Sequence, residues 1–142
     1  MGYALAVAAA VVWGLSYALG QKALAKWTVW QFTAMWSVMG LALSVPLIWR
    51  NFATVRKNFE MDDLLVVGGV VASAFVAELL ILGAIKKIGA SKAGVFECSY
   101  PVFIALFAAL LFRERLPALF YVGTGIIVIG ATVVAYAMRG SA

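Results

Sequence analysis

Five long apolar stretches, separated by short polar segments, dominate the pattern of hydrophobic and polar positions along the 142-residue chain. Each stretch is close to the roughly 20 residues that an α-helix needs to cross a bilayer core of about 30 Å. The pattern therefore predicts five membrane-spanning helices, at residues 3–24, 30–49, 64–85, 90–112 and 118–138.

The connectors between these stretches are short, and the longest is predicted at residues 50–63. They leave no room for a catalytic domain outside the membrane, so we expect one all-α domain over residues 1–142, an integral membrane bundle. The first stretch has no basic segment before it and is too long and aromatic for a signal peptide, so we expect it to be retained. The expected location is the cell membrane, multi-pass, as the inner or plasma membrane of a prokaryote.

Composition supports lipid as the solvent and narrows the chemistry. The chain is 65% hydrophobic and 12% charged, with a mean hydropathy of +1.04, outside the range of soluble domains. It has no histidine and one cysteine, Cys98, so a histidine-based metal or catalytic site and an internal disulfide are excluded. The net charge of +5 is spread thinly over the loops, which argues against nucleic acid as a partner. With no cofactor motif in view, we expect neither an enzyme nor a cofactor.

Five spans place the chain ends on opposite sides of the membrane and sort the 11 basic residues into two groups. The N-terminal side holds Arg50, Arg56, Lys57, Arg113 and Arg115, and the other side holds Lys22, Lys26, Lys86, Lys87, Lys92 and Arg139. Because an excess of Lys and Arg sets orientation, this near balance permits either orientation or dual topology. The alternative is that the first helix or a few dominant residues fix one orientation.

Two carboxylates, Glu78 and Glu97, fall inside predicted spans, where an ionised acid is costly and usually faces a cavity or a partner. The short segment between the third and fourth spans makes these helices antiparallel, which places both acids roughly 10 to 12 Å below the same surface. If they face each other, repulsion and desolvation oppose double ionisation, and the pair would hold one proton near neutral pH. Such a pair is suited to proton coupling. The alternative is a structural role, with each acid protonated or paired with a lysine such as Lys92.

Pro101 adds a second polar feature beside Glu97. A proline inside a helix cannot donate to the carbonyl four residues earlier, and that carbonyl belongs to Glu97. With Ser99 and Tyr100 adjacent, the segment would form a polar site within lipid that protein, water or substrate must satisfy. A simple packing kink is the competing interpretation.

Three aromatic residues, Trp13, Tyr17 and Trp36, fall at a similar depth, roughly 9 to 17 Å from that surface. Aromatic walls around an acidic site suit organic solutes, and ring faces attract cations. Plain packing is the alternative for each ring. Ala131 and Ala135 form a small-xxx-small pair that could support dimerisation through the fifth helix.

Several segments resemble one repeat of the EamA group in the drug/metabolite transporter superfamily. They are WGLSYALGQKAL at 13–24, LGAIKKIGASKAG at 82–94, ECSYPVFIALFAALLFRERL at 97–116 and GTGIIVIGATVV at 123–134. The resemblance implies half of an inverted-repeat architecture of ten helices, with the substrate path between the halves. It therefore implies that two copies associate, and an antiparallel homodimer would reproduce the inverted pair.

The chain departs from the family pattern in the turn between the fourth and fifth predicted spans, which has Arg113 and Glu114 where the family usually has Gly and Glu. Small multidrug transporters of the superfamily carry their essential acid in the first helix, where this chain has none.

We therefore expect a secondary transporter of small organic solutes, drugs or metabolites, that works as a dimer by alternating access. Glu97, and with it Glu78, would exchange protons for solute, while the path would be lined by Trp13, Tyr17, Trp36, Ser99 and Tyr100. Two other classes stay open at this point. One is a passive channel or uniporter formed between protomers, and the other is a scaffold subunit whose acids pair with a partner helix.

Overall fold

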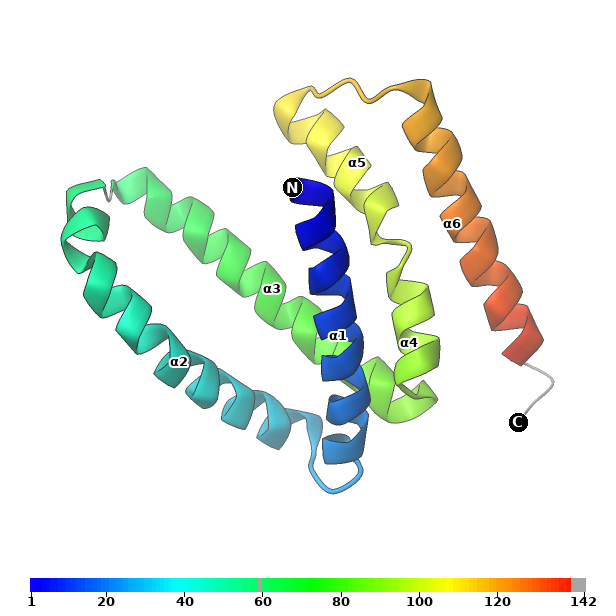
Figure 1. Ribbon diagram of the computed structural model, residues 1–142, viewed down its shortest axis with the longest axis horizontal. Helices are drawn as coiled ribbons and strands as arrows, with labels where there is room; N and C mark the ends of the chain where they lie inside the picture. The colour runs from blue at the N-terminus through cyan, green and yellow to red at the C-terminus, as the bar shows by residue number, and fades with distance from the viewer. Residues whose placement is uncertain (59, 139–142) are drawn as a thin grey trace.

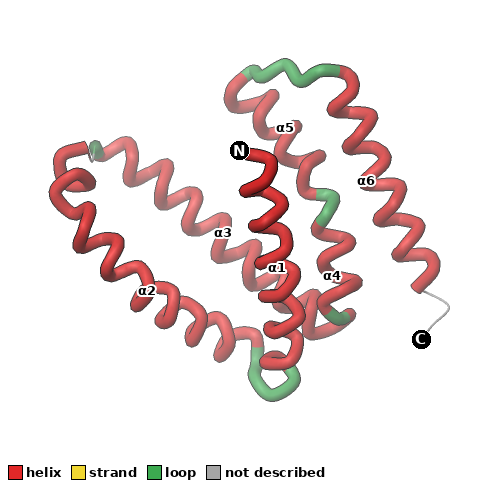
Figure 2. Tube along the Cα trace, viewed as in Figure 1, coloured by secondary structure: helices red, strands yellow, loops and turns green. Residues whose placement is uncertain are grey.

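The computed structural model describes residues 1–58 and 60–138, and the described part of the chain is helical without strands (Figures 1 and 2). The side chains of Val55 and Asn58 are outside the description. The helices are α1 (Gly2–Leu24), α2 (Val29–Asn58), α3 (Met61–Ile88), α4 (Ala90–Glu97), α5 (Tyr100–Phe112) and α6 (Ala118–Ala137).

Five helical segments are long and apolar enough to cross a membrane: Gly2–Leu24, Val29–Thr54, Met61–Ile88, Ala90–Phe112 and Ala118–Ala137. The predicted all-α membrane bundle of five spans is therefore confirmed, with boundaries that differ by a few residues. The fourth span consists of α4 and α5 together.

Polar caps define the starts of α2 and α3. Thr28 and Gln31 exchange two hydrogen bonds at the start of α2, because each backbone N–H donates to the side-chain oxygen of the other residue, at 3.0 and 3.2 Å. At the start of α3, the Glu60 N–H donates to Asp63 Oδ2 at 3.0 Å. Such reciprocal caps satisfy N–H groups that a helix leaves without partners.

The connector predicted at residues 50–63 is much shorter than expected. Helix α2 continues to Asn58 and α3 begins at Met61, so most of the polar segment after Trp49 is helix. The reason is local, since residues 50–58 contain neither glycine nor proline to end a helix.

The fourth span is interrupted at Cys98 and Ser99, directly before Pro101 (Figure 2). There the backbone tightens, because the Ser99 N–H donates to the carbonyl of Phe96, three residues earlier, at 3.1 Å. Pro101 then occupies the first turn of α5, where its missing N–H is tolerated. The predicted kink is thus a break between two helices, with Glu97 as the last residue of α4.

The buried core lies at one end of the bundle, where the ends of α1, α2, α3 and α4 converge (Figure 1). Its buried members are Leu24, Leu82, Ile85 and Ala93, and Tyr17, Val29 and Phe32 pack against them. Toward the opposite end, the α2–α3 hairpin diverges from α5 and α6 (Figure 1). This convergence at one end fixes the position of α4 relative to α1 and α3.

Much of the apolar surface has no cover within the chain. The first seventeen residues of α3, 61–77, are all exposed, and a Cβ atom added to Gly68 or Gly123 would meet nothing within 4 Å. Lipid or another protein surface must cover these faces in the membrane. The pair Ala131 and Ala135 behaves differently, because Ala131 is buried and Ala135 half-buried, on a helix that packs against α4 and α5. Ala131 therefore packs inside the chain, and the dimerisation role suggested for the pair stays a prediction.

Candidate functional site in the membrane

A hydrogen bond joins the first and fourth spans at the predicted acidic site. The Tyr17 hydroxyl donates to Glu97 Oε1 at 2.7 Å, across 80 residues of sequence, and both side chains are half-buried. This length is within the usual range of an O–H···O hydrogen bond. Glu97 therefore has a specific donor inside the membrane-spanning region.

Glu78 belongs to the same site. Helix α3 packs against both α1 and α4, and this places half-buried Glu78 close enough to Glu97 for their charges to interact. The Tyr17 hydroxyl also lies within electrostatic range of Glu78 and of Tyr100. We call Tyr17, Glu78, Glu97 and Tyr100 the acidic cluster.

The cluster contains no compensating cation. Within the described part of the chain, no lysine or arginine forms an ion pair with Glu78 or Glu97, and that includes the half-buried Lys92. The structural alternative that paired each acid with a lysine is therefore absent from this arrangement. Two carboxylates with one phenol donor can accept a proton or a cationic group.

A second polar contact holds α4 against α1, one helical turn from the first. The side chain of Gln21 lies four residues beyond Tyr17, on the same face of α1, and its Oε1 accepts a hydrogen bond from the Ala90 N–H at 2.6 Å. Between these two contacts the Tyr17 ring passes over Gly94, whose added Cβ would lie 3.9 Å from Tyr17 Cδ2. Sequence analysis missed Gln21, although its spacing of four from Tyr17 is the signal that could have found it.

Gly89 makes the turn that brings α4 back along α3. Its backbone has φ 86° and ψ 157°, a region that is essentially restricted to glycine. One residue therefore separates α3 from α4, and this tight turn sets Glu78 and Glu97 at comparable depth on antiparallel helices.

The aromatic residues divide into two groups. Trp13 belongs with the cluster, because its ring lies 5.8 Å from that of Tyr17 at an interplanar angle of 57°, and its outer face is exposed. Trp36 lies on α2 and is also exposed, 46% of its surface, and no ring contact within the described residues links it to Trp13 or Tyr17. Its role in lining the path stays a prediction.

The break in the fourth span carries the polar residues Ser99 and Tyr100. The Ser99 hydroxyl donates to the Phe96 carbonyl at 2.7 Å, so it serves the break itself in this conformation. Tyr100 is exposed and Pro101 half-buried. The substrate-binding roles of Ser99 and Tyr100 stay predictions, as does the proton-coupling role of the two acids.

These features define the class of the protein as a multi-pass helical membrane protein with a carboxylate site between its spans. The model of the EamA-like transporter family matches residues 1–136, and the chain belongs to this family. The resemblance noted in the sequence is thereby confirmed, and the chain is a member of a family of membrane transporters. No curated protein and no solved structure matches the chain.

Proposed function

We propose that the protein is a secondary active transporter that exchanges protons for a small organic solute through Glu97 and Glu78. The observation that carries the proposal is the hydrogen bond from Tyr17 to Glu97, with Glu78 in electrostatic range. Carboxylates and phenols are groups that can take up and release protons, and this site brings two carboxylates and a phenol together within the spans.

The exchange follows because the proton and the solute compete for the same carboxylate oxygens of Glu78 and Glu97. A solute that binds the carboxylates favours their ionised form, and by linkage its binding releases the proton that the pair holds. When the solute leaves, the pair takes up a proton from the side to which the site is open. Alternating access of the site to the two sides then couples the two fluxes in opposite directions.

The chemistry of the cluster favours cationic or amphipathic solutes. Two acids without an ion-paired lysine or arginine in the described residues attract positive charge, and the exposed ring faces of Trp13 and Tyr100 offer apolar and cation–π contact. An anionic solute would meet repulsion at the same position.

We further propose that two copies enclose the site as a homodimer in the cell membrane of a prokaryote. Glu78 and Glu97 are only half-buried within one chain, and a carboxylate cannot leave its remaining surface against lipid tails. The uncovered glycine faces of α3 and α6 allow another helix to approach closely. An antiparallel pair of copies fits the near balance of basic residues on the two sides.

The decisive experiment measures proton release when solutes are added to the detergent-purified protein in weak buffer. The probes are tetraphenylphosphonium, a neutral amino acid and benzoate, with binding recorded separately by calorimetry. We expect release with the cation, loss of release in Glu97→Gln and a reduced release in Glu78→Gln. Glu114→Gln is the matched control, because Glu114 lies in the loop between α5 and α6.

A solute that binds the wild-type protein without any proton release would overturn the exchange mechanism and favour a uniporter or channel. Release that persists unchanged in both Glu97→Gln and Glu78→Gln would assign the proton to another group. Flux of the solute through reconstituted vesicles that never saturates would identify a passive pore.

A further inference from the structure

Charge is divided unequally between the two ends of the bundle. At the end where α1, α2, α3 and α4 converge, the described residues include five lysines, which we call the lysine face: Lys22, Lys26, Lys86, Lys87 and Lys92. None of the six acidic residues lies there, because four lie at the opposite end of the bundle and two in the acidic cluster. The lysine face therefore carries a net positive charge, whereas the opposite end has four acids beside its five basic residues. Arg139 lies outside the described residues.

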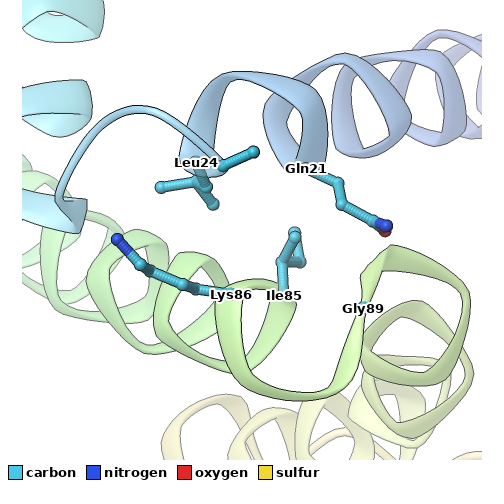
Figure 3. Close-up of a pocket in the computed structure, with 6 residues that line it drawn as sticks. Gln21, Leu24, Ile85, Lys86 and Gly89 are labelled. Atoms are coloured by element: carbon cyan, nitrogen blue, oxygen red, sulfur yellow. The ribbon is translucent and has the colours of Figure 1, made fainter.

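Lys86 of the lysine face lines a cavity of about 420 Å³ between the end of α1 and the turn from α3 to α4 (Figure 3). Its walls are formed by Gln21, Leu24, Ala25, Ile85, Lys86 and Gly89. Leu24 and Ile85 are buried and make an apolar floor. The polar side chains of the wall belong to Gln21 and Lys86, and neither is an acid.

The polar side chains of this cavity have N–H donors that no acceptor within the described residues uses. The Gln21 amide uses its oxygen to accept from Ala90, which leaves both N–H groups of its NH2 as donors. Lys86 Nζ donates to the carbonyl of Trp27 at 2.8 Å, and an ammonium has three N–H donors. A ligand that complements this lining must supply acceptor oxygens.

The other lysines of the lysine face also favour a ligand with acceptor oxygens and negative charge. No hydrogen bond or ion pair within the described part of the chain involves the side chain of Lys22, Lys26, Lys87 or Lys92. Three of the five lysines stand in the last turns of α1 and α3, where a cation is favourable for the helix itself. Lys92 is different, because it lies in the first turn of α4, where the helix dipole disfavours a cation. A nearby anion would compensate this cost.

The position of the cavity matches the depth of lipid headgroups. It lies at the ends of the spans, next to the loop that carries Trp27 and precedes Trp30, and tryptophan concentrates at the membrane–water interface. Basic pockets between helix ends at this depth bind the headgroups of anionic lipids. The exposed apolar side chains of Leu19 and Ile88 lie nearby in sequence and can contact acyl chains.

We propose that the cavity at the lysine face binds the phosphate headgroup of an anionic phospholipid. The bound headgroup bridges the end of α1 and the α3–α4 turn through Gln21 and Lys86. It thereby reinforces the contact between α1 and α4 that also carries the Tyr17–Glu97 hydrogen bond. Both leaflets of a bacterial-type membrane offer phosphatidylglycerol, so the site is compatible with either orientation of the chain.

The test compares lipids and lysine variants with the full-length protein in detergent. Dioleoylphosphatidylglycerol, dioleoylphosphatidylcholine and inorganic phosphate are titrated while thermal unfolding is followed by tryptophan fluorescence, and retained lipid is counted by native mass spectrometry. We expect an upward shift of the melting temperature with phosphatidylglycerol only. Its apparent affinity should fall about fivefold in Lys86→Gln and in Lys22→Gln, the typical contribution of one basic residue at an anionic surface.

Lys57→Gln is the matched control, because it removes the same charge from the opposite end of the bundle. Lys22→Gln guards against misfolding of Lys86→Gln, since Lys22 is exposed and does not belong to the buried core or to the residues packed against it. Equal shifts with the two phospholipids would overturn the proposal. A full shift of the melting temperature with inorganic phosphate would also overturn it, because the cavity would then bind a free anion. An equal loss of apparent affinity in Lys57→Gln would overturn it too, because the effect would then come from the overall charge of the protein.

Discussion

The Tyr17 hydroxyl donates a 2.7 Å hydrogen bond to Glu97 Oε1, and the two residues are the point at which the first and fourth spans exchange polar contact within the membrane. Glu97 ends α4 just before the helix break. Tyr17 is held in place by Trp13 on one side and by the surface of Gly94 on another. The pair therefore combines a packed donor with an acceptor at the break in the fourth span.

Replacing Tyr17 by phenylalanine keeps the ring and removes only the donor. We expect Tyr17→Phe to lower proton-coupled uptake about tenfold, since a hydrogen bond to a charged group contributes about 1.5 to 3 kcal/mol. Uptake into proteoliposomes with an imposed pH gradient measures this effect. Tyr121→Phe on α6 is the control, because Tyr121 is exposed and far along the chain from the cluster. Unchanged coupling in Tyr17→Phe would remove the hydrogen bond from the mechanism.

The two tryptophans predicted to line the path should differ in importance. Trp13 contacts Tyr17, so we expect Trp13→Leu to weaken binding of tetraphenylphosphonium by about 1 kcal/mol, or about fivefold, through loss of aromatic contact. Trp36→Leu should weaken this binding less, because within one chain Trp36 has no ring contact with the acidic cluster. Isothermal titration calorimetry distinguishes the two variants. A larger loss in Trp36→Leu would show that α2 approaches the site in the dimer.

The turn at Gly89 should not tolerate a side chain. Its φ of 86° and ψ of 157° belong to a region that costs other residues on the order of 1 to 3 kcal/mol. Gly89→Ala is therefore expected to destabilise the protein by that amount in a denaturant titration in mixed micelles. Gly83→Ala, inside α3, is the control, because a Cβ there meets nothing within 4 Å, and alanine favours a helix by about 1 kcal/mol. Similar stabilities for the two variants would contradict the strained turn.

Among the described residues, Thr33 Oγ1 is the one fully buried side-chain nitrogen or oxygen atom without a hydrogen bond. The residue is 2% exposed. A buried unsatisfied hydroxyl costs roughly 1 to 3 kcal/mol, so the nearly isosteric Thr33→Val should raise stability by about 1 kcal/mol. Thr132→Val is the control and should be neutral or slightly destabilising, because Thr132 Oγ1 donates to the Val128 carbonyl at 2.9 Å. Destabilisation by Thr33→Val would indicate that Oγ1 has a partner in the membrane.

Cysteine labelling tests dual topology. In a Cys98→Ala background the protein has no native thiol, so Ser91→Cys and Glu114→Cys each place one thiol at opposite ends of the bundle without changing the basic residues. With both orientations present, an impermeant maleimide should label each variant in about half of the molecules, as the near balance of basic residues predicts. Full labelling of one variant and none of the other would establish a single orientation.

The sequence by itself determined the membrane environment, the five spans and the two acids within them. These features are local, because hydrophobic length sets a span and a short connector makes neighbouring helices antiparallel. The break beside Glu97 was also predictable in outline, since Pro101 removes one backbone donor whatever surrounds it. The family resemblance rested on the same ordered segments, and the family match over residues 1–136 agrees with it.

Only the tertiary structure decided which side chains meet. The hydrogen bond between Tyr17 and Glu97 joins residues 80 positions apart, and hydropathy alone does not fix the rotation of a helix about its axis. The same reason explains why Gln21 was missed, why Ala131 packs inside the chain, and why Trp36 stands apart from Trp13. In lipid, apolar surface is solvated on every side, so small residues and a few polar contacts select the helix faces that pack together.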